Sequence, residues 1–554
     1  MLLHPARKYP AFQPVELPAR QWPSRRQTRA PTWLSTDLRD GNQALATPMN
    51  AAQKLRFFHM LLACGFKQIE VAFPAASQTD FDFVRTLLAD GHVPDDVTLQ
   101  VITQSRPDLI ARTFEALHGA RRAIVHLYNA TAPAWRRQVF ATDRAGVRAL
   151  AERGTRQIRE LAAANPGTDW QFQYSPETFS ATEPDFALEI CDAVSEIWQP
   201  TPQRKMIINL PATVELSSPN HYADQIEWMH GRLARRDSIV LSVHPHNDRG
   251  TAVAAAELAL LAGAERVEGC LFGNGERTGN VDLLTLALNL YTQGIAPELD
   301  FSDIDAVRAL VEDSIGLPVH PRHPYAGELV YTAFSGSHQD AIRKGMALQH
   351  DAEPWQVPYL PLDPADVGRS YQALIRVNSQ SGKGGISWLL EQHYGLQLPR
   401  ALQQDFAGLV QAETDRAGQE LAAEQLYRLF RQHYLSEHGP WRYVSHRQQQ
   451  VQGQTRLEIS LQHGAQPQQR QGCGNGPLDA LLAAMAVPLQ LLDYQQHALG
   501  SGSAARAICY LQLQDATGKH CFGVAEDDNL ELAALRALLA GINAHSRQPP
   551  AQAA

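Results

Sequence analysis

Short apolar runs recur at regular intervals through the first half of the chain. Eight of them are rich in β-branched or aromatic residues and predict strands at residues 32–37, 69–73, 98–103, 123–128, 169–174, 206–210, 238–243 and 266–272. The segments between them have the apolar spacing of helices. A strand followed by a return helix is the repeating unit of a parallel sheet. Eight such units predict a (β/α)8 TIM barrel of the α/β class, with a doubly wound open sheet as the alternative.

The pattern changes twice further along the chain. Residues 31–305 carry the barrel pattern, and residues 306–435 have mainly helical spacing, which predicts a helical linker region. Residues 436–546 begin rich in glutamine and then alternate between strand and helix periods. They contain an alternating strand at 456–461, a helix at 478–487, strands at 508–513 and 520–525, and a helix at 530–543. This predicts a separate C-terminal α+β domain.

The two ends of the chain differ from the rest. Residues 1–30 hold six basic residues and one acidic residue, a bias that transit peptides share. Five prolines in the same stretch argue against the amphipathic helix that such a peptide needs. We expect an extended arm on the protein surface, with a targeting segment as the alternative. Residues 547–554 are expected to form a disordered tail.

Composition narrows the function classes. The chain has 554 residues, 44% of them hydrophobic and 19% charged, which is typical of a globular protein. Its 49 basic and 58 acidic residues give a net charge of −9, so we expect neither nucleic acid nor an anionic membrane as a partner. No apolar run reaches the roughly 18 residues of a membrane span. Six scattered cysteines without a CxxC pair argue against a disulfide framework and favour a cytoplasmic location.

Polar residues collect where the predicted strands end. In a barrel these ends share one face, and active sites lie on that face. The residues concerned are Arg39, Asp40, His126, Tyr128, Ser175, Glu177, Asn209, Thr213, His244, His246 and Asn280. The sequence therefore predicts one site built from distant segments.

His244 and His246 give the strongest chemical signal. Residues two apart on a strand point the same way, and two imidazoles beside the carboxylate of Asp40 suit a divalent metal. Closure of the barrel brings the last strand beside the first, so the amide oxygen of Asn280 could be a fourth ligand. Mg²⁺, Mn²⁺, Zn²⁺ and Co²⁺ all accept such a set. A solvated or core pair of histidines is the alternative.

Two further residues are candidates for catalysis. Arg39 lies beside Asp40, where a cation can stabilise a developing oxyanion or enolate, whereas a surface salt bridge is the alternative. Glu177 follows the fifth strand and could be a general base or a wall of the site. His338 and Tyr371 lie beyond the barrel, and the local pattern by itself favours structural roles for both.

Six stretches resemble the 2-isopropylmalate synthase family in its longer form. They are residues 38–43, 175–180, 209–215, 244–283, 333–342 and 377–385. The family belongs to the metal-dependent barrel synthases and lyases that act on acyl-CoA and 2-oxo acids. The resemblance implies an acyltransferase that condenses acetyl-CoA with 3-methyl-2-oxobutanoate and hydrolyses the thioester. The products are (2S)-2-isopropylmalate and CoA, and the reaction is the first committed step of leucine biosynthesis.

The resemblance also implies roles for particular residues. A divalent metal, with Mg²⁺ expected, would be held by Asp40, His244, His246 and Asn280. Catalysis would involve Arg39, Glu177, His338 and Tyr371. The oxo-acid pocket would be lined by His126, Tyr128, Ser175, Asn209, Pro211 and Thr213. The C-terminal domain resembles the family's regulatory domain, which implies feedback inhibition by leucine and a homodimer.

Two other functions are compatible with the same pattern. A citramalate or homocitrate synthase would share the metal site and differ only in the pocket for the oxo acid. A catalytically inactive leucine-sensing protein is a third possibility, although the intact set of Asp40, His244 and His246 argues against it.

Overall fold

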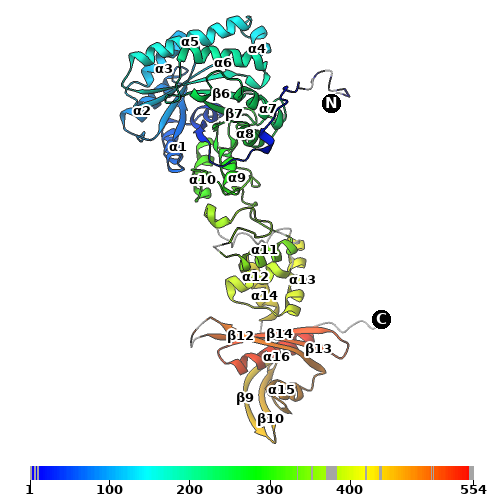
Figure 1. Ribbon diagram of the computed structural model, residues 1–554. Coiled ribbons are helices and arrows are strands. Elements are labelled where there is room, and N and C mark those ends of the chain that lie inside the picture. Colours follow the sequence, from blue (N-terminus) through cyan, green and yellow to red (C-terminus); the bar gives the residue numbers. More distant parts are fainter. Residues whose placement is uncertain are drawn as a thin grey trace. The chain divides into compact units, whose positions relative to one another are not determined.

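A computed structural model describes most of the chain. It covers residues 3–4, 6, 8, 12–333, 335–350, 353–369, 383–417, 421–435, 439–500, 502 and 505–547. The chain divides into two compact units (Figure 1). The first contains residues 1–330 and 365–369, and the second contains residues 331–364 and 370–554.

The first unit is built on a closed barrel of eight parallel strands in sequence order. The strands are β1 (Thr32–Ser35), β2 (Gln68–Ala72), β3 (Thr98–Gln104), β4 (Arg122–Ala130), β5 (Asp169–Glu177), β6 (Met206–Ala212), β7 (Ile239–Pro245) and β8 (Arg266–Gly269). Strand β8 pairs with β1, with Thr32 opposite Arg266, and this pairing closes the barrel. The predicted TIM barrel and its eight strands are confirmed, and the open-sheet alternative is wrong.

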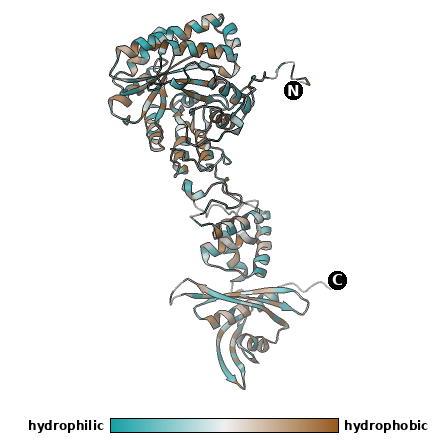
Figure 2. Ribbon diagram, viewed as in Figure 1, coloured by the Kyte–Doolittle hydropathy of each residue, from teal (hydrophilic) through white to brown (hydrophobic). Residues whose placement is uncertain are grey.

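Helices surround this barrel. They are α1 (Ala51–Ala63), α2 (Gln78–Ala89), α3 (Pro107–Ala116), α4 (Pro133–Gln138), α5 (Arg144–Ala164), α6 (Pro184–Trp198), α7 (Pro219–His230), α8 (Ala252–Leu261), α9 (Leu283–Tyr291) and α10 (Ile304–Ile315). They carry both polar and apolar residues (Figure 2). In α5, for example, Val147, Ala151 and Ile158 are buried. The side chain of Asp143 caps that helix by accepting from the backbone N–H of Gly146.

The N-terminal segment follows the outer surface of the barrel. Residues 12–31 contain only a short 3-10 turn at Trp22–Ser24. The guanidinium of Arg20 donates to both carboxylate oxygens of Asp224 on α7, at 2.6 Å each. The indole N–H of Trp22 donates to the same carboxylate at 2.8 Å. These contacts attach the segment to α7.

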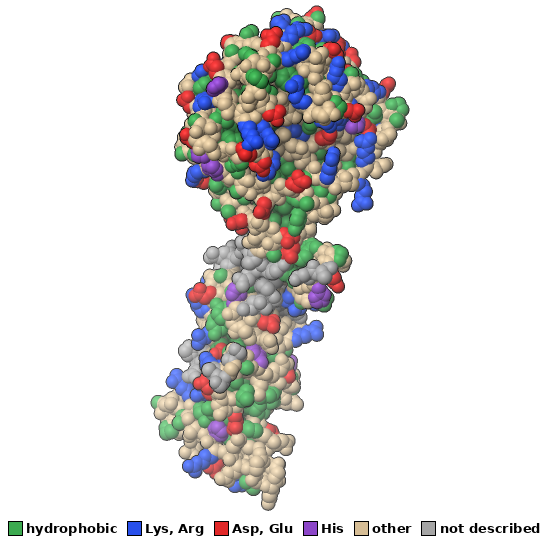
Figure 3. All heavy atoms as spheres, turned by 60° about the vertical axis from the view of Figure 1, so that its left-hand side comes forward, with side chains coloured by type: hydrophobic (Ala, Val, Ile, Leu, Met, Phe, Trp, Pro, Cys, Tyr) green, Lys and Arg blue, Asp and Glu red, His purple; other side chains and the backbone are tan. Residues whose placement is uncertain are grey.

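Basic and acidic side chains are interspersed over the barrel on the face shown in Figure 3, so that this face does not carry charge of a single sign. Within the described part of the chain, none of the helices has the length and apolar character that crossing a bilayer requires.

The second unit combines helices with two antiparallel sheets. Its helices are α11 (Gly336–Leu348), α12 (Lys383–Tyr394), α13 (Arg400–Ala417), α14 (Ala423–Tyr434), α15 (Pro477–Met485) and α16 (Leu530–Arg547). Its strands are β9 (Trp441–Val451), β10 (Gln454–His463), β11 (Gln466–Gly474), β12 (Leu489–Leu499), β13 (Arg506–Asp515) and β14 (His520–Asp527). The sheet orders are β11-β10-β9 and β12-β13-β14. The predicted C-terminal α+β fold is confirmed.

Strand β13 is buried on both faces. Ile508 and Tyr510 lie in a core that includes buried residues of α12, α13 and α14. Their sequence neighbours Cys509 and Leu511 lie in a second core with residues of α15 and α16. Because successive side chains of a strand point to opposite faces, this one strand joins both cores. The helices α12–α14 therefore share their packing with the C-terminal sheet.

Close packing of α16 on β14 leads to a prediction about stability. A Cβ atom added at Gly523 would lie 2.0 Å from the carbonyl oxygen of Ala537 and 2.7 Å from the backbone nitrogen of Gly541. Both are backbone atoms, so the helix itself would have to move. We expect Gly523→Ala to lower the free energy of unfolding by about 1–3 kcal/mol, measured by denaturant titration.

The control is Gly408→Ala in α13. A Cβ atom there meets nothing within 4 Å, and the residue is exposed. Since alanine is the better helix former, this variant should be neutral or gain up to about 1 kcal/mol. Equal stability of the Gly523→Ala protein and the unsubstituted protein would contradict the packing argument.

Candidate active site

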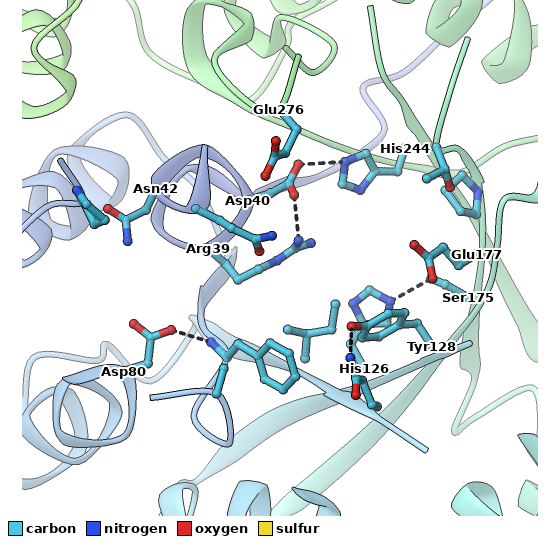
Figure 4. Close-up of a pocket in the computed structure, with 18 of the residues that line it drawn as sticks. Arg39, Asp40, Asn42, Asp80, His126, Tyr128, Ser175, Glu177, His244 and Glu276 are labelled. Carbon is cyan, nitrogen blue, oxygen red and sulfur yellow. Dashed lines mark hydrogen bonds and ion pairs between the residues drawn. The ribbon is translucent and has the colours of Figure 1, made fainter. Parts of the chain in front are cut away.

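A cavity of about 760 Å³ lies at the carboxyl ends of the barrel strands. Eleven of the predicted site residues line it, and most are labelled in Figure 4. They are Arg39, Asp40, His126, Tyr128, Ser175, Glu177, Asn209, Pro211, Thr213, His244 and His246. Barrel closure thus brings together side chains that are scattered over more than 200 residues of sequence.

Three of these residues form a cluster that could hold a metal ion. Asp40 lies in a single π-helical turn (Asp37–Gly41) after β1. His244 lies near the end of β7, and His246 lies just beyond that strand. The Nε2 atoms of His244 and His246 lie 3.7 and 3.9 Å from Oδ2 of Asp40. One ligand atom from each residue lies within 4.8 Å of the other two. All three side chains are buried.

Asn280 lies against this cluster without being exposed to the cavity. Its Oδ1 is 2.7 Å from Nε2 of His244, and its Nδ2 donates to Oδ2 of Asp40 at 2.8 Å. His246 has a buried Nδ1 with no hydrogen-bond partner among the described residues. Two imidazoles, a carboxylate and an amide oxygen are a nitrogen and oxygen donor set that divalent cations accept. The residues present therefore fit a divalent metal.

The protonation states of Asp40 and His246 are consistent with this fit. Burial opposes the charge of Asp40, but Arg39 and His244 outweigh it and hold the pKa of the carboxyl well below its usual range. Burial and the neighbouring His244 lower the pKa of His246 to about 4. Although burial acts against it, contacts with Asp40 and Glu268 raise the pKa of His244 to about 10. Asp40 and His246 are thus in their metal-binding forms, whereas a proton on His244 would compete with a cation.

Arg39 is held beside the cluster. Its Nη1 donates to Oδ1 of Asp40 at 2.8 Å, and its Nε donates to Glu70. The side chain is only 11% exposed and lines the cavity. The alternative of a surface salt bridge is therefore wrong.

The opposite wall of the cavity is a hydrogen-bonded row from β4, β5 and β6. Nε2 of His126 lies 2.7 Å from the hydroxyl of Ser175, which accepts a bond from Asn209 at 3.0 Å. Tyr128 accepts a bond from Gln104 at 3.0 Å. Figure 4 shows His126, Tyr128 and Ser175 facing Arg39 across the cavity. The row presents polar groups toward the space beside the metal-binding cluster.

Glu177 stands near the end of β5 and faces the same space (Figure 4). Burial raises the pKa of its carboxyl above the ordinary value, and the positive charge of Arg39 only partly offsets this effect. A carboxylate with a raised pKa is a stronger base once it is ionised.

One of the two remaining predicted residues lies in the second unit. His338 lies on α11 of the second unit, where its exposed ring packs against Tyr359 with ring centres 4.1 Å apart. Tyr371 lies outside the described residues. The proposed roles of both stay predictions.

The sequence analysis missed two buried acids that support the site. Glu70 on β2 pairs with Arg39 and lies 2.9 Å from Nδ1 of His126. Glu268 on β8 lies 3.3 Å from Nδ1 of His244. Neither side chain has any exposed surface. An acidic residue in the middle of a strand predicted to be buried was the available signal, because such a charge needs a partner.

The far end of the cavity was also missed. Lys54 on α1 is buried, and its Nζ lies 2.6 Å from Oδ1 of Asp80 on α2. The other oxygen of Asp80 accepts from the backbone N–H of Phe73 at 2.9 Å (Figure 4). This pair fixes the segment after β2 as a wall of the cavity. Nothing in the local sequence around Lys54 distinguishes it from a surface lysine.

Comparison with protein families divides the chain into three matched regions. Residues 30–311 match the HMGL-like family. Residues 328–391 match the alpha-isopropylmalate synthase, post-catalytic domain-like family. Residues 420–546 match the LeuA allosteric (dimerisation) domain.

Similar proteins span the whole chain. The 2-isopropylmalate synthase of Pseudomonas putida (strain W619) is 58% identical over 555 residues, covering 100% of both chains. That of Cupriavidus taiwanensis is 61% identical over 546 residues, covering 98% of this chain and 96% of its own. A solved hydroxymethylglutaryl-CoA lyase from Pseudomonas aeruginosa is 18% identical, with a TM-score of 0.44, over 53% of this chain and 95% of its own. On the full-length identity of its relatives, the chain belongs to the 2-isopropylmalate synthase family.

Proposed function

We propose that the protein is an acyltransferase that condenses acetyl-CoA with 3-methyl-2-oxobutanoate and hydrolyses the thioester, giving (2S)-2-isopropylmalate and CoA. The observation that carries the proposal is the cluster of Asp40, His244 and His246 in the cavity at the carboxyl ends of the barrel strands. The 58% identity to a 2-isopropylmalate synthase along the entire chain supports the choice of substrates.

Asp40, His244, His246 and Asn280 would hold a divalent cation, and we propose Mg²⁺ as the ion used. When bound, such a cation supplies Lewis-acid polarisation of the keto group of the oxo acid. His126, Ser175 and Asn209 would bind and orient the oxo acid from the opposite wall, together with Tyr128, Pro211 and Thr213.

The chain's own groups would carry out the proton transfers. Glu177 takes a proton from the methyl group of acetyl-CoA, and Arg39 stabilises the enolate oxygen that forms. The resulting carbon attacks the keto carbon, and the keto oxygen becomes a hydroxyl by taking up a proton. Water then cleaves the thioester and releases CoA as a thiol. His338 is proposed to assist these proton transfers, and Tyr371 is proposed to act in catalysis or in its control.

Regulation and assembly are proposed from the C-terminal region. Its match to an allosteric dimerisation domain supports a homodimer that leucine inhibits. A cytoplasmic location is proposed as well, and it is supported by the six cysteines, all of which are free thiols.

The activity is tested with the purified full-length protein. We expect Mg²⁺-dependent release of free thiol from acetyl-CoA when 3-methyl-2-oxobutanoate is present. A panel containing pyruvate and 2-oxoglutarate should show lower kcat/KM, since small changes in a pocket alter discrimination by roughly 1–3 kcal/mol. Preference for pyruvate or 2-oxoglutarate would make the protein a citramalate or homocitrate synthase instead.

Glu177 gives a prediction about pH. If its carboxylate is the base, kcat should fall as pH drops through its raised pKa, because only the ionised form accepts a proton. We expect Glu177→Gln to lower kcat by about 10²–10⁴-fold. Residual turnover in this variant should lack the acidic limb that the unsubstituted enzyme shows in a pH–kcat profile.

The matched control is Glu152→Gln on the outer surface of α5, where Glu152 pairs with Arg148 and Arg156. This change should leave both kcat and the profile intact. Turnover of Glu177→Gln within threefold of the unsubstituted enzyme would exclude Glu177 as the base.

A further inference from the structure

The interior of the barrel below the cavity is charged. Arg266, the first residue of β8, has no exposed side-chain surface, and neither has Glu268 two residues later. Residues two apart on a strand share a face, so both point into the barrel. TIM-barrel interiors are usually filled by branched apolar side chains. A buried arginine and glutamate at these positions are a departure that calls for a physical reason.

Arg266 is bonded to side chains from several strands at once. Its Nε donates to Gln68 at 2.6 Å, and its Nη2 donates to Gln100 at 2.8 Å. Its Nη1 faces Gln173 at 3.1 Å, Ser242 at 3.0 Å and Glu268. The planar guanidinium is thus fixed by acceptors on β2, β3, β5, β7 and β8.

This anchoring fixes the carboxylate of Glu268. Its Oε1 is held by Arg266 and also accepts from Gln173 at 2.8 Å and from Ser242 at 3.0 Å. Its Oε2 faces Nδ1 of His244 at 3.3 Å. With Oε1 held at three points, Oε2 stays directed at the imidazole.

The direction of that contact decides how His244 can act. Because Nδ1 donates to Glu268, Nε2 on the side of Asp40 and Asn280 is the ring nitrogen left for a cation. A cation there would take the place of the proton that Nε2 donates to Oδ1 of Asn280 at 2.7 Å. Carboxylates that accept from the second nitrogen of a metal-binding histidine fix its tautomer and ring orientation. The same side chain of Glu268 therefore links Arg266 to the metal-binding cluster.

We propose that Arg266 is a positioning residue of the metal centre, which acts through Glu268 to hold His244 in its metal-binding orientation. The proposal rests on the proposed function, because it requires that His244 binds the cation. Folding stability alone does not explain why these two charged residues are buried. The free-energy cost of removing both charges from water opposes the favourable energy of the ion pair. An apolar pair of similar volume would fill the barrel interior at no such cost.

The test measures metal binding rather than turnover. The full-length protein is stripped of metal and titrated with MnCl₂ by calorimetry, with thermal unfolding recorded alongside. Arg266→Met should weaken Mn²⁺ binding by about 10–100-fold, the range seen when a partner of a metal ligand is removed. Arg266→Lys keeps the charge without the guanidinium fork, so we expect a smaller loss. If Arg266→Met does not fold, Arg266→Lys provides the test of Mn²⁺ binding.

The matched control is Arg236→Met. Arg236 also holds a glutamate, Glu265 at 2.7 Å, and donates to two backbone carbonyls, but neither residue contacts His244. It should lose stability without losing Mn²⁺ affinity. Glu268→Gln should weaken binding as Arg266→Met does. Adding Arg266→Met to Glu268→Gln should change the affinity by less than about threefold, because the two act through one contact.

The possible outcomes distinguish failure of the inference about Arg266 from failure of the proposed metal centre. A folded Arg266→Met or Arg266→Lys protein that binds Mn²⁺ as tightly as the unsubstituted protein overturns this inference alone. The inference is also overturned if adding Arg266→Met to Glu268→Gln weakens Mn²⁺ binding by a further factor of about 10–100, because the two residues would then act independently. If the unsubstituted protein does not bind Mn²⁺, or His244→Ala binds it equally well, the proposed metal centre fails and the inference fails with it.

Discussion

Replacing His244 with alanine should lower turnover by at least about 10³-fold while leaving the fold nearly native. The loss follows because the imidazole is one of three close donors, and Lewis-acid catalysis supplies several kcal/mol of transition-state stabilisation. The fold should persist because Glu268 keeps its bonds to Arg266, Gln173 and Ser242. The measurements are initial rates of thiol release, Mn²⁺ binding by calorimetry and circular dichroism.

His221→Ala is the matched control for that experiment. His221 is as buried as His244, at 6% against 5% exposed, but it lies on α7 with its ring against Phe12. Its removal should affect stability and leave metal binding intact. Unchanged turnover in His244→Ala would show that the histidine pair is merely structural and would end the case for a metal at this site.

Replacing Arg39 with methionine should lower kcat by about 10²–10³-fold, as loss of an oxyanion-stabilising donor does elsewhere. Arg39 would act on charge that develops only in the enolate. KM for acetyl-CoA should therefore change much less than kcat. Arg39→Lys keeps the charge but not the fork that bridges Asp40 and Glu70, so its loss should be smaller. Steady-state rates with varied acetyl-CoA separate these effects.

Arg136→Met is the control for the Arg39 variants. Its side chain is buried to nearly the same degree, 10% against 11% exposed, and it bonds Glu183 at 2.6 Å outside the cavity. It should reduce stability and leave kcat intact. A kcat for Arg39→Met above about one tenth of the normal value would assign Arg39 to structure rather than to catalysis.

The proposed inhibition by leucine should be tested with amino-acid substitutions in the C-terminal domain and not by truncating the chain. A cut near residue 430 would remove Ile508, Tyr510 and Val524 from the core that they share with Phe406 and Leu426. Such a cut also falls inside α14 (Ala423–Tyr434), so α13 and the remainder of α14 would expose apolar surface to water. Loss of inhibition in such a protein would not distinguish a missing leucine site from an unfolded linker region.

The strands could be predicted where their burial produces a recognisable pattern of apolar residues in the local sequence. The barrel strands and β13 are largely buried on both faces and appear as short runs rich in β-branched or aromatic residues, although Gln, Glu or Arg interrupts several of them. Strand β10 alternates because Leu457, Ile459 and Leu461 face a core. By contrast, β9, β11 and β12 were missed. They are largely exposed and rich in glutamine, so neither an apolar run nor a clear alternation marks them. Their pairing partners, not their own residues, make them strands.

By itself, the sequence determined the barrel, the strand-end positions of Asp40, His244 and His246, and the chemistry that those residue types allow. It could do so because strand period and burial are local properties of the chain. Tertiary structure alone decided that Glu70, Arg266 and Glu268 form a charged network beneath the site, and that Lys54 borders the cavity. Those contacts depend on which distant side chains fill the same interior volume, and the local sequence pattern around each residue does not show which distant residues it will contact.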